Sequence, residues 1–246
     1  MSKLHMKVAL TLFLSMSFFF KMGAQAALIL LFFGNKLARP DLHLSLDAGL
    51  NFSNISQVDG DMRIGPNFGL GLHVGLTDQL FLVPEFKALS TRGLKSVKNP
   101  VFDLPADIQN LSVASVESFV RLNYLDFPVL LQYRTKKHFY FSGGIEACFL
   151  NKANYQTDIV LDNGNELELR QDVKSKLKKF DLGIPIEVGY VIFPAVDGKG
   201  MDVRLRYTFG LFDVLDGATS SPAKNSNFQL IATFPIVYPE DKEKKK

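Results

Sequence analysis

The sequence predicts an all-β protein, an eight-stranded antiparallel up-and-down β-barrel that spans a membrane. Apolar and polar residues alternate with a period of two over most of residues 41–238, which is the period of a β-strand and not of a helix. The connections between the strands are alternately short and long, as in bacterial outer-membrane barrels, whose short turns face the periplasm. An even number of strands also places the last strand antiparallel to the first, so the sheet closes without a free edge.

The composition excludes several classes of protein. A net charge of +3 over 246 residues gives no electrostatic reason to expect nucleic acid as a partner. The single cysteine, Cys148, excludes an intramolecular disulfide framework and a multi-cysteine metal site. No phosphate-binding glycine loop or metal-ligand spacing is present, so we expect no cofactor. The chain has 22 phenylalanines and no tryptophan, and lipid is one answer to what so many aromatic rings face.

The amino terminus has the layout of a secretory signal peptide, which we assign to residues 1–26. Lys3, His5 and Lys7 precede an apolar run over residues 8–20, and Ala24-Gln25-Ala26 provides a small-x-small cleavage pattern. Residues 27–40 form an apolar linker segment. If the signal is not cleaved, the two apolar runs together span the ~20 residues that a bilayer needs, and the alternative is a membrane anchor.

The barrel is assigned to residues 41–238, and residues 239–246 to a charged, solvated tail. The expected strands cover residues 41–52, 67–76, 80–88, 118–133, 139–152, 180–192, 202–211 and 227–238. Short turns are expected at residues 77–79, 134–138 and 195–199, and long polar connections at residues 55–65, 91–117, 153–178 and 213–226. The Asn163-Gly164 dipeptide is a strong turn signal, so part of the third long connection is expected to extend two strands beyond the membrane as a hairpin.

Two features interrupt the regular pattern. In the fourth strand Arg121 and Asn123 share one face, whereas Asp126 and Gln132 have the opposite parity. The polar set stays on one side only if a bulge lies near Tyr124 and Leu125. Prolines at 84, 128, 185 and 235 also fall inside strands, and bulges or strand ends must accommodate them, because proline lacks the N–H of the ladder.

We expect the apolar face to point outward to lipid. Each strand supplies roughly five to seven apolar residues, more than the narrow interior of an eight-stranded barrel can hold. Aromatic residues gather near both strand ends and fit two interfacial girdles, Tyr133, Phe139 and Tyr238 at the short-turn end and Phe52, Phe68, Phe149, Phe180 and Phe228 at the loop end. A soluble, lipocalin-like barrel in the periplasm, with its apolar face turned inward around a ligand, is the alternative.

The other face carries charges of both signs that must pair in a narrow lumen. The predicted lumen polar network comprises Asp47, His73, Glu85, Lys87, Arg121, Asp126, Glu146, Asp181, Glu187, Asp202, Arg204 and Arg206. Ser45, Asp47 and His73 lie close together in this arrangement, which a nucleophile, an orienting acid and a base would require. A hydrogen-bond network in the lumen explains the same residues, and we predict no catalytic residues.

One strand resembles a known family. Residues 124–133, YLDFPVLLQY, are similar to the Tyr-(Leu/Ile)-Glu-Ile-Pro-Leu-Leu-Leu-Lys-Tyr strand of the PorT-like outer-membrane β-barrel family of Bacteroidota, with Asp126 in place of the usual glutamate. Residues 47–53 and 141–144 resemble further strands of that family. The resemblance implies an eight-stranded barrel in the outer membrane, and some members are accessory parts of the type IX secretion and gliding machinery.

The predicted function follows from this fold. We expect a monomeric, non-enzymatic outer-membrane barrel in contact with outer-membrane lipids. Its extracellular loops are expected to contact a protein or glycan partner, because function in a rigid barrel tends to lie on its connections. Accessory membership of a type IX-like secretion system is a further alternative.

Overall fold

The computed structural model describes residues 38–39, 41–97, 102, 112–196, 199–215 and 221–236. Its strands are β1 (Ala38–Arg39), β2 (Leu42–Ile55), β3 (Asp61–Gly75), β4 (Leu80–Lys95), β5 (Val113–Arg134), β6 (Phe139–Leu161), β7 (Glu166–Asp172), β8 (Phe180–Val196), β9 (Lys199–Gly210) and β10 (Asn225–Ile236), with one 3-10 turn, η2 (Lys174–Lys176). Within these ranges no helix is long and apolar enough to cross a bilayer. The signal peptide, the apolar run after it and the charged tail lie outside the described residues.

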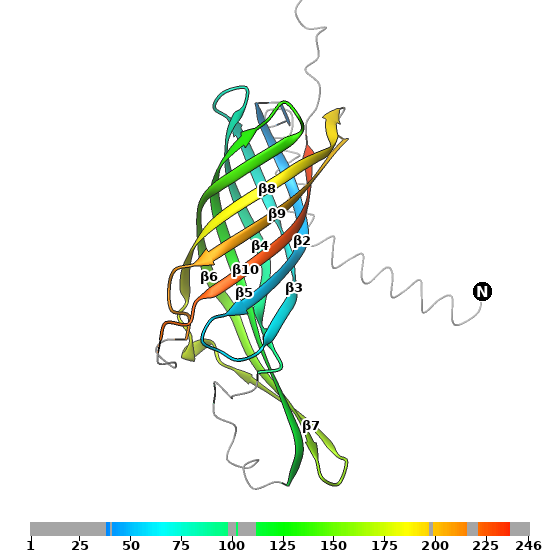
Figure 1. The fold of residues 1–246 in the computed structure, drawn as a ribbon, viewed down its shortest axis with the longest axis vertical. Helices are drawn as coiled ribbons and strands as arrows, with labels where there is room; N and C mark the ends of the chain where they lie inside the picture. Colours follow the sequence, from blue (N-terminus) through cyan, green and yellow to red (C-terminus); the bar gives the residue numbers. More distant parts are fainter. Residues whose placement is uncertain are drawn as a thin grey trace, which may run out of the picture.

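Eight of the strands close into a ring. The order is β2, β10, β9, β8, β6, β5, β4, β3, and β3 pairs back onto β2, so the predicted eight-stranded antiparallel up-and-down barrel is confirmed (Figure 1). The closing pair of β2 and β10 runs from Ile236 opposite Leu44 to Asn225 opposite Ile55. The short strand β1 pairs with the start of β2, so pairing begins before the predicted first residue.

The alternation sorts side chains as predicted, with the apolar face outside. Ile186 and Leu205 are 51% and 42% exposed, while Arg204 and Arg206, on the other face of β9, are each 1% exposed. This is the reverse of a soluble calyx, which would hold apolar side chains around a central ligand. The barrel is therefore built for an apolar surrounding medium.

Aromatic rings form a continuous row around the outside near the loop end. Phe86, Phe127, Phe149, Phe180 and Phe212 follow one another from β4 to the residues after β9, with ring centroids 5.0, 5.7, 5.3 and 6.0 Å apart. At the short-turn end Phe139 and Tyr190 lie 4.8 Å apart. Tyr238 of the predicted girdle lies outside the described residues.

The aromatic row at the loop end and the aromatic pair at the short-turn end are separated by about the height of the apolar band of a membrane. Phe149 lies ten residues after Phe139 along β6. At about 3.3 Å per residue and a strand tilt of about 40°, this separation spans about 25 Å along the barrel axis. This is the height of the apolar band in outer-membrane barrels.

The bulge predicted near Tyr124 and Leu125 is not in β5, because the extra residues lie in its neighbouring strands. On one side Phe68 and Gly69 of β3 pair with Leu89 and Lys87, which leaves Ala88 of β4 unpaired. On the other side the pairing of β5 with β6 skips one residue of β6, at position 151. Because β5 keeps its parity from Ser118 to Gln132, its even-numbered residues stay inside over this range. The prediction that Arg121 joins the lumen network is therefore wrong, since Arg121 is exposed on the outer face.

The prolines lie where the pairing between neighbouring strands is interrupted or ends, and not at bulges. Near Pro84, Pro128 and Pro185 the pairings of β3 with β4, β4 with β5 and β6 with β8 are interrupted and resume in the same register. Pro235 lies beside the last residue of β10, a strand end as predicted. The missing N–H groups therefore cost pairs without shifting the strands.

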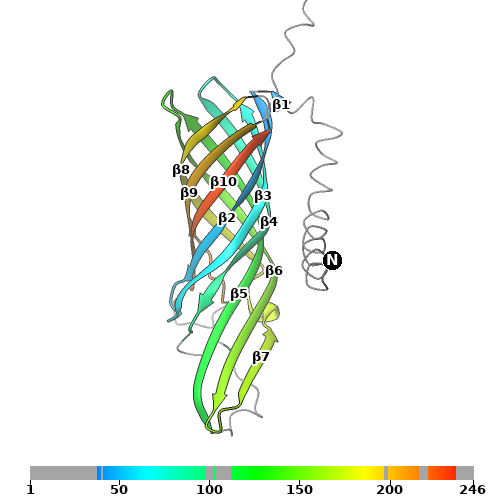
Figure 2. The same ribbon diagram turned by 90° about the vertical axis from the view of Figure 1, so that its right-hand side faces the viewer.

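Two strands of the ring, β5 and β6, continue well beyond it at the loop end, where β7 pairs with β6. β5 and β6 have 22 and 23 residues, whereas β9 and β10 have 12 each. Gln156 of β6 pairs with Arg170 of β7, and the hairpin turns at residues 162–165 with Gly164 at φ +82°, so the predicted extension is confirmed. Figures 1 and 2 show β5, β6 and β7 projecting from the barrel as a narrow sheet, which we call the extended wall.

Candidate functional site

The centre of the lumen is filled by a cluster of six charged side chains, which we call the central cluster. Its members are Asp47, Glu85, Lys87, Glu187, Arg204 and Arg206. Three carboxylates thus face three cations. Every member was predicted from the sequence as part of the lumen network. Since buried charges are tolerable only when paired, the balance of signs is what allows this interior to exist.

Arginine forks connect the cluster around the barrel. Arg206 donates two hydrogen bonds of 2.8 Å to Glu85 of β4, and its Nε and NH2 groups lie 2.9 and 2.7 Å from Oε2 of Glu187 on β8. Arg204 donates to Glu85 at 2.7 Å and to Asp47 at 2.5 Å. Lys87 also donates to Asp47. Bidentate arginine–carboxylate pairs are the strong form of this interaction, so strands far apart in sequence are tied together.

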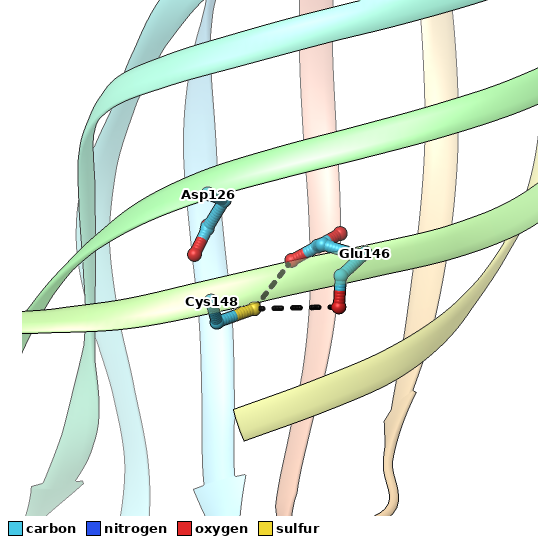
Figure 3. Close-up of side chains that lie close together, drawn as sticks. All are labelled: Asp126, Glu146 and Cys148. Atoms are coloured by element: carbon cyan, nitrogen blue, oxygen red, sulfur yellow. Dashed lines mark hydrogen bonds between the residues drawn. The ribbon is translucent and has the colours of Figure 1, made fainter. Parts of the chain in front are cut away.

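A second cluster, which we call the Arg92 cluster, lies toward the loop end. Asp126, Glu146 and Cys148 point into the barrel from β5 and β6 (Figure 3). The NH2 group of Arg92 donates to Asp126 at 2.6 Å and to Glu146 at 2.5 Å, and its NH1 group lies 3.6 Å from Sγ of Cys148. The three ligand atoms could in principle hold a metal ion. In this structure the guanidinium of Arg92 supplies the positive charge among them.

Sequence reasoning missed Arg92. The alternation ends at Ala88, and the residues beyond Thr91 read as a loop, although β4 continues to Lys95. The signal that could have found Arg92 is the bulge at Ala88, because it shifts the inward parity of β4 from odd to even positions. Arg92 is 1% exposed and stacks on Tyr124, with its guanidinium carbon 5.2 Å from the ring centre.

The remaining predicted acids are also buried in the lumen. Asp181 accepts a hydrogen bond of 2.9 Å from the amide of Asn225, which also donates to Tyr124 at 3.2 Å. Asp202 is 6% exposed and is attracted electrostatically by Arg134 and Arg204. With these two, eleven of the twelve predicted network residues face the lumen, and Arg121 is the exception.

The interior becomes apolar toward the loop end, which the sequence analysis did not foresee. A cluster of buried residues, which we call the mouth cluster, includes Ile55, Leu94, Leu122, Tyr155 and Val214. Phe102, from the long connection before β5, packs edge-on against Tyr155 at 5.3 Å. Phe102 therefore covers part of the barrel mouth; Val101 and Leu104 lie outside the described residues.

The possible catalytic trio does not assemble. Nε2 of His73 lies 3.1 Å from the hydroxyl of Ser45, but its Nδ1 is 3.1 Å from a guanidinium nitrogen of Arg134. Asp47 is instead held by Lys87, Arg204 and the hydroxyl of Thr233. His43 is 2% exposed and stacks on His73 at 4.6 Å. The base thus lacks an orienting acid.

A small group of apolar side chains lies at the short-turn end of the lumen. Phe81, Val83 and Leu130 form a small apolar cluster, and the guanidinium of Arg134 covers the ring of Phe81 at 4.0 Å. From one end to the other the described interior thus consists of an apolar cap, the central cluster, the Arg92 cluster and the mouth cluster.

The chain is similar to a known protein family. The family model described as "Outer membrane protein beta-barrel domain" matches residues 34–216 of the chain. The chain belongs to this family. Proteins of this family reside in the outer membrane. The exposed apolar surface of this barrel therefore faces the lipids of that membrane. No curated protein matches the chain.

Several solved structures are similar. Ail, the attachment invasion locus protein of Yersinia pestis, is 10% identical with a TM-score of 0.42, and the match covers 80% of this chain and 99% of Ail. Neisserial surface protein A is 11% identical with a TM-score of 0.39, covering 79% and 96%. OprG from Pseudomonas aeruginosa is 12% identical with a TM-score of 0.35, covering 81% and 94%.

Proposed function

We propose that this protein is a monomeric, non-enzymatic and non-conducting outer-membrane barrel that presents the extended wall as a contact surface for a protein or a glycan outside the cell. The observation that carries the proposal is the length of β5 and β6, about ten residues more than β9 and β10. At about 3.3 Å per residue and a strand tilt of about 40°, these extra residues extend the sheet by as much as about 25 Å beyond the ring. A barrel that needed only to cross the membrane would not require it.

The surface of the extended wall suits contact with a partner. Val116 of β5 and Leu167 of β7 are 47% and 38% exposed, and Glu168 and Arg170 form an exposed ion pair at 2.5 Å. Apolar side chains within a polar frame are typical of interaction sites. Long outward loops are also where barrels of this kind carry variable function.

The interior supports the absence of catalysis and conduction. The charged side chains of the central cluster and of the Arg92 cluster are bound to one another, which supports a structural role for them. The central cluster and the Arg92 cluster lie between the mouth cluster at the loop end and the apolar cluster of Phe81, Val83 and Leu130 at the short-turn end. An eight-stranded barrel is narrow enough for side chains to fill it.

The finer family assignment remains part of this proposal. The segment 124–133 resembles the PorT-like strand, and Asp126, the position where it departs from the family pattern, binds Arg92 in the lumen. A role as an accessory of a type IX-like secretion system rests on that resemblance alone. In such a role the extended wall would contact another component of the secretion machinery.

Shortening the hairpin tests the proposed contact surface. Removing residues 158–168 and joining Thr157 to Leu169 through Asn-Gly keeps the pair that these residues already form. It also keeps Tyr155 and Val173 in the mouth cluster. The barrel should therefore assemble normally, as judged by heat-modifiable migration on a gel, while partner proteins cross-linked in intact outer membranes, or binding to a glycan array, are lost.

The matched control removes charge at the opposite end of the barrel. Lys136→Gln with Lys137→Gln changes the exposed turn between β5 and β6, and partner binding should not change. If the shortened protein assembles and retains every partner of the full chain, the contact-surface proposal is wrong.

A further inference from the structure

A basic groove lies on the outside of the barrel where the extended wall leaves the ring. Its volume is about 500 Å³. Four cationic side chains line it, one from each of β3, β4, β5 and β7, together with two apolar ones; they are Arg63, Lys95, Arg121, Arg170, Ile64 and Phe119. No carboxylate is among the described residues that line the groove. Charge complementarity therefore favours an anion.

Two of these cations, Arg63 and Arg121, lie close together. Arg63 and Arg121 repel each other electrostatically, and no ion pair to either is found among the described residues. The Nε group of Arg63 is buried and has no hydrogen-bond partner. By contrast, Arg170 is paired with Glu168, and Lys95 has Asp61 as its cross-strand neighbour. A repelling pair of guanidiniums with an unsatisfied donor points to a ligand that is itself negatively charged.

The fold leaves room between the two arginines. β4 runs between β3 and β5, and its residue opposite Arg121 is Gly93, at φ +133°. A Cβ atom added there would lie 2.0 Å from the carbonyl oxygen of Val120, so no side chain can be placed at this position without a shift. The pairing of β3 with β4 is also interrupted between Met62 and Asn67, around Arg63. The strand between the arginines therefore presents bare backbone.

The position along the barrel identifies the source of the anion. On the outer face of β5, Leu125 is followed by Asn123 and then Arg121 toward the loop end. The separation of four residues from Leu125 to Arg121 corresponds to about 13 Å of strand and about 10 Å along the barrel axis. The polar headgroup layer of a bilayer is about 5–8 Å thick on each side. The backbone of Arg121 thus lies a few ångströms beyond this layer, and the groove opens at the outer surface of the headgroups, with Phe119 and Ile64 beside the charges.

We propose that this groove binds a phosphate group of the phosphorylated glycolipid that forms the outer leaflet, with Arg63 and Arg121 as the principal ligands. Guanidinium groups bind phosphate through paired hydrogen bonds, and a phosphate between them would remove their mutual repulsion. The apolar pair would contact the sugar part of the same lipid. This site does not depend on the hairpin tip, because both arginines lie outside the segment that the shortened variant removes.

Lipid binding to the full-length protein in detergent, followed by native mass spectrometry, tests the proposal. The probes are bisphosphorylated lipid A, the same lipid with its phosphates removed, and inorganic phosphate as competitor. The test variant is Arg63→Gln with Arg121→Gln, and the control is Lys136→Gln with Lys137→Gln, which removes the same charge at the other end. We expect the test variant to bind lipid A at least about tenfold more weakly, as the loss of one charged hydrogen bond would cause.

The other arms decide the source and the chemistry. The dephosphorylated lipid should bind the unmodified protein as weakly as lipid A binds the test variant, and the control variant should bind normally. Equal binding of lipid A to the test and control variants would overturn the proposal, as would equal binding of the two lipids. Full competition by inorganic phosphate at the concentration of the lipid would make the groove a site for soluble anions and would overturn it as well.

Discussion

Replacing Arg92 with methionine should destabilise the barrel by about 3–5 kcal/mol, the usual result of removing one partner from a buried ion pair. The guanidinium touches both Asp126 and Glu146, and these side chains are 1% exposed. Without it, two buried carboxylates would remain with no ion-pair partner among the described residues. Urea unfolding of the protein folded into phospholipid vesicles measures the free energy directly.

The control for this prediction is an exposed pair in the same protein. Arg170 and Glu168 lie 2.5 Å apart, but their side chains are 69% and 49% exposed. Arg170→Met should therefore cost no more than about 1 kcal/mol. Adding Asp126→Asn and Glu146→Gln to Arg92→Met should recover part of the loss, since the unpaired charges are then removed. If Arg92→Met and Arg170→Met cost the same, the Arg92 cluster does not hold the lumen together.

Replacing Ile186 with arginine should cost about 2–4 kcal/mol, because a basic residue on the lipid face is most unfavourable at the bilayer midplane. Ile186 pairs with Gly143, between the aromatic pairs Phe139–Tyr190 and Phe149–Phe180 of the two girdles. It is therefore close to the middle of the apolar band. The measurement is the free energy of unfolding in vesicles, with Ile186→Ala as the control for lost side-chain volume.

Depth supplies the second control for this prediction. Ile192 is 41% exposed on the same strand but lies beyond Tyr190, toward the short turns. Ile192→Arg should cost only about 0–1 kcal/mol, the value expected near the interface. Equal costs at Ile186 and Ile192 would mean that the oily surface does not cross a bilayer.

Much of this fold follows from the sequence because the alternation of a β-strand is local. The sequence of each strand shows which of its residues share a face, so the residues of the central cluster could be predicted one by one. The turn at Asn163-Gly164 is likewise local, and the hairpin around it was predicted. What a strand cannot encode is the register against its neighbours, and Arg204 and Glu85, which bind each other, are 119 residues apart.

The errors have the same physical origin. A bulge changes parity in the strand that contains it, and the sequence of β5 alone suggested a bulge that the structure places in β4 and β6. That displacement moved Arg121 to the outer face and concealed Arg92 in a stretch that read as a loop. The mouth cluster was missed because it assembles from connections as well as strands, among them Phe102 and Val214.

Current across a planar lipid bilayer tests most directly the central claim that the lumen is sealed by its own side chains. The full-length protein, inserted and verified as folded by heat-modifiable migration, should give no steady conductance at any physiological membrane voltage, because the central cluster lies between two apolar caps. A steady ohmic conductance that appears with insertion of the folded protein would contradict a sealed lumen.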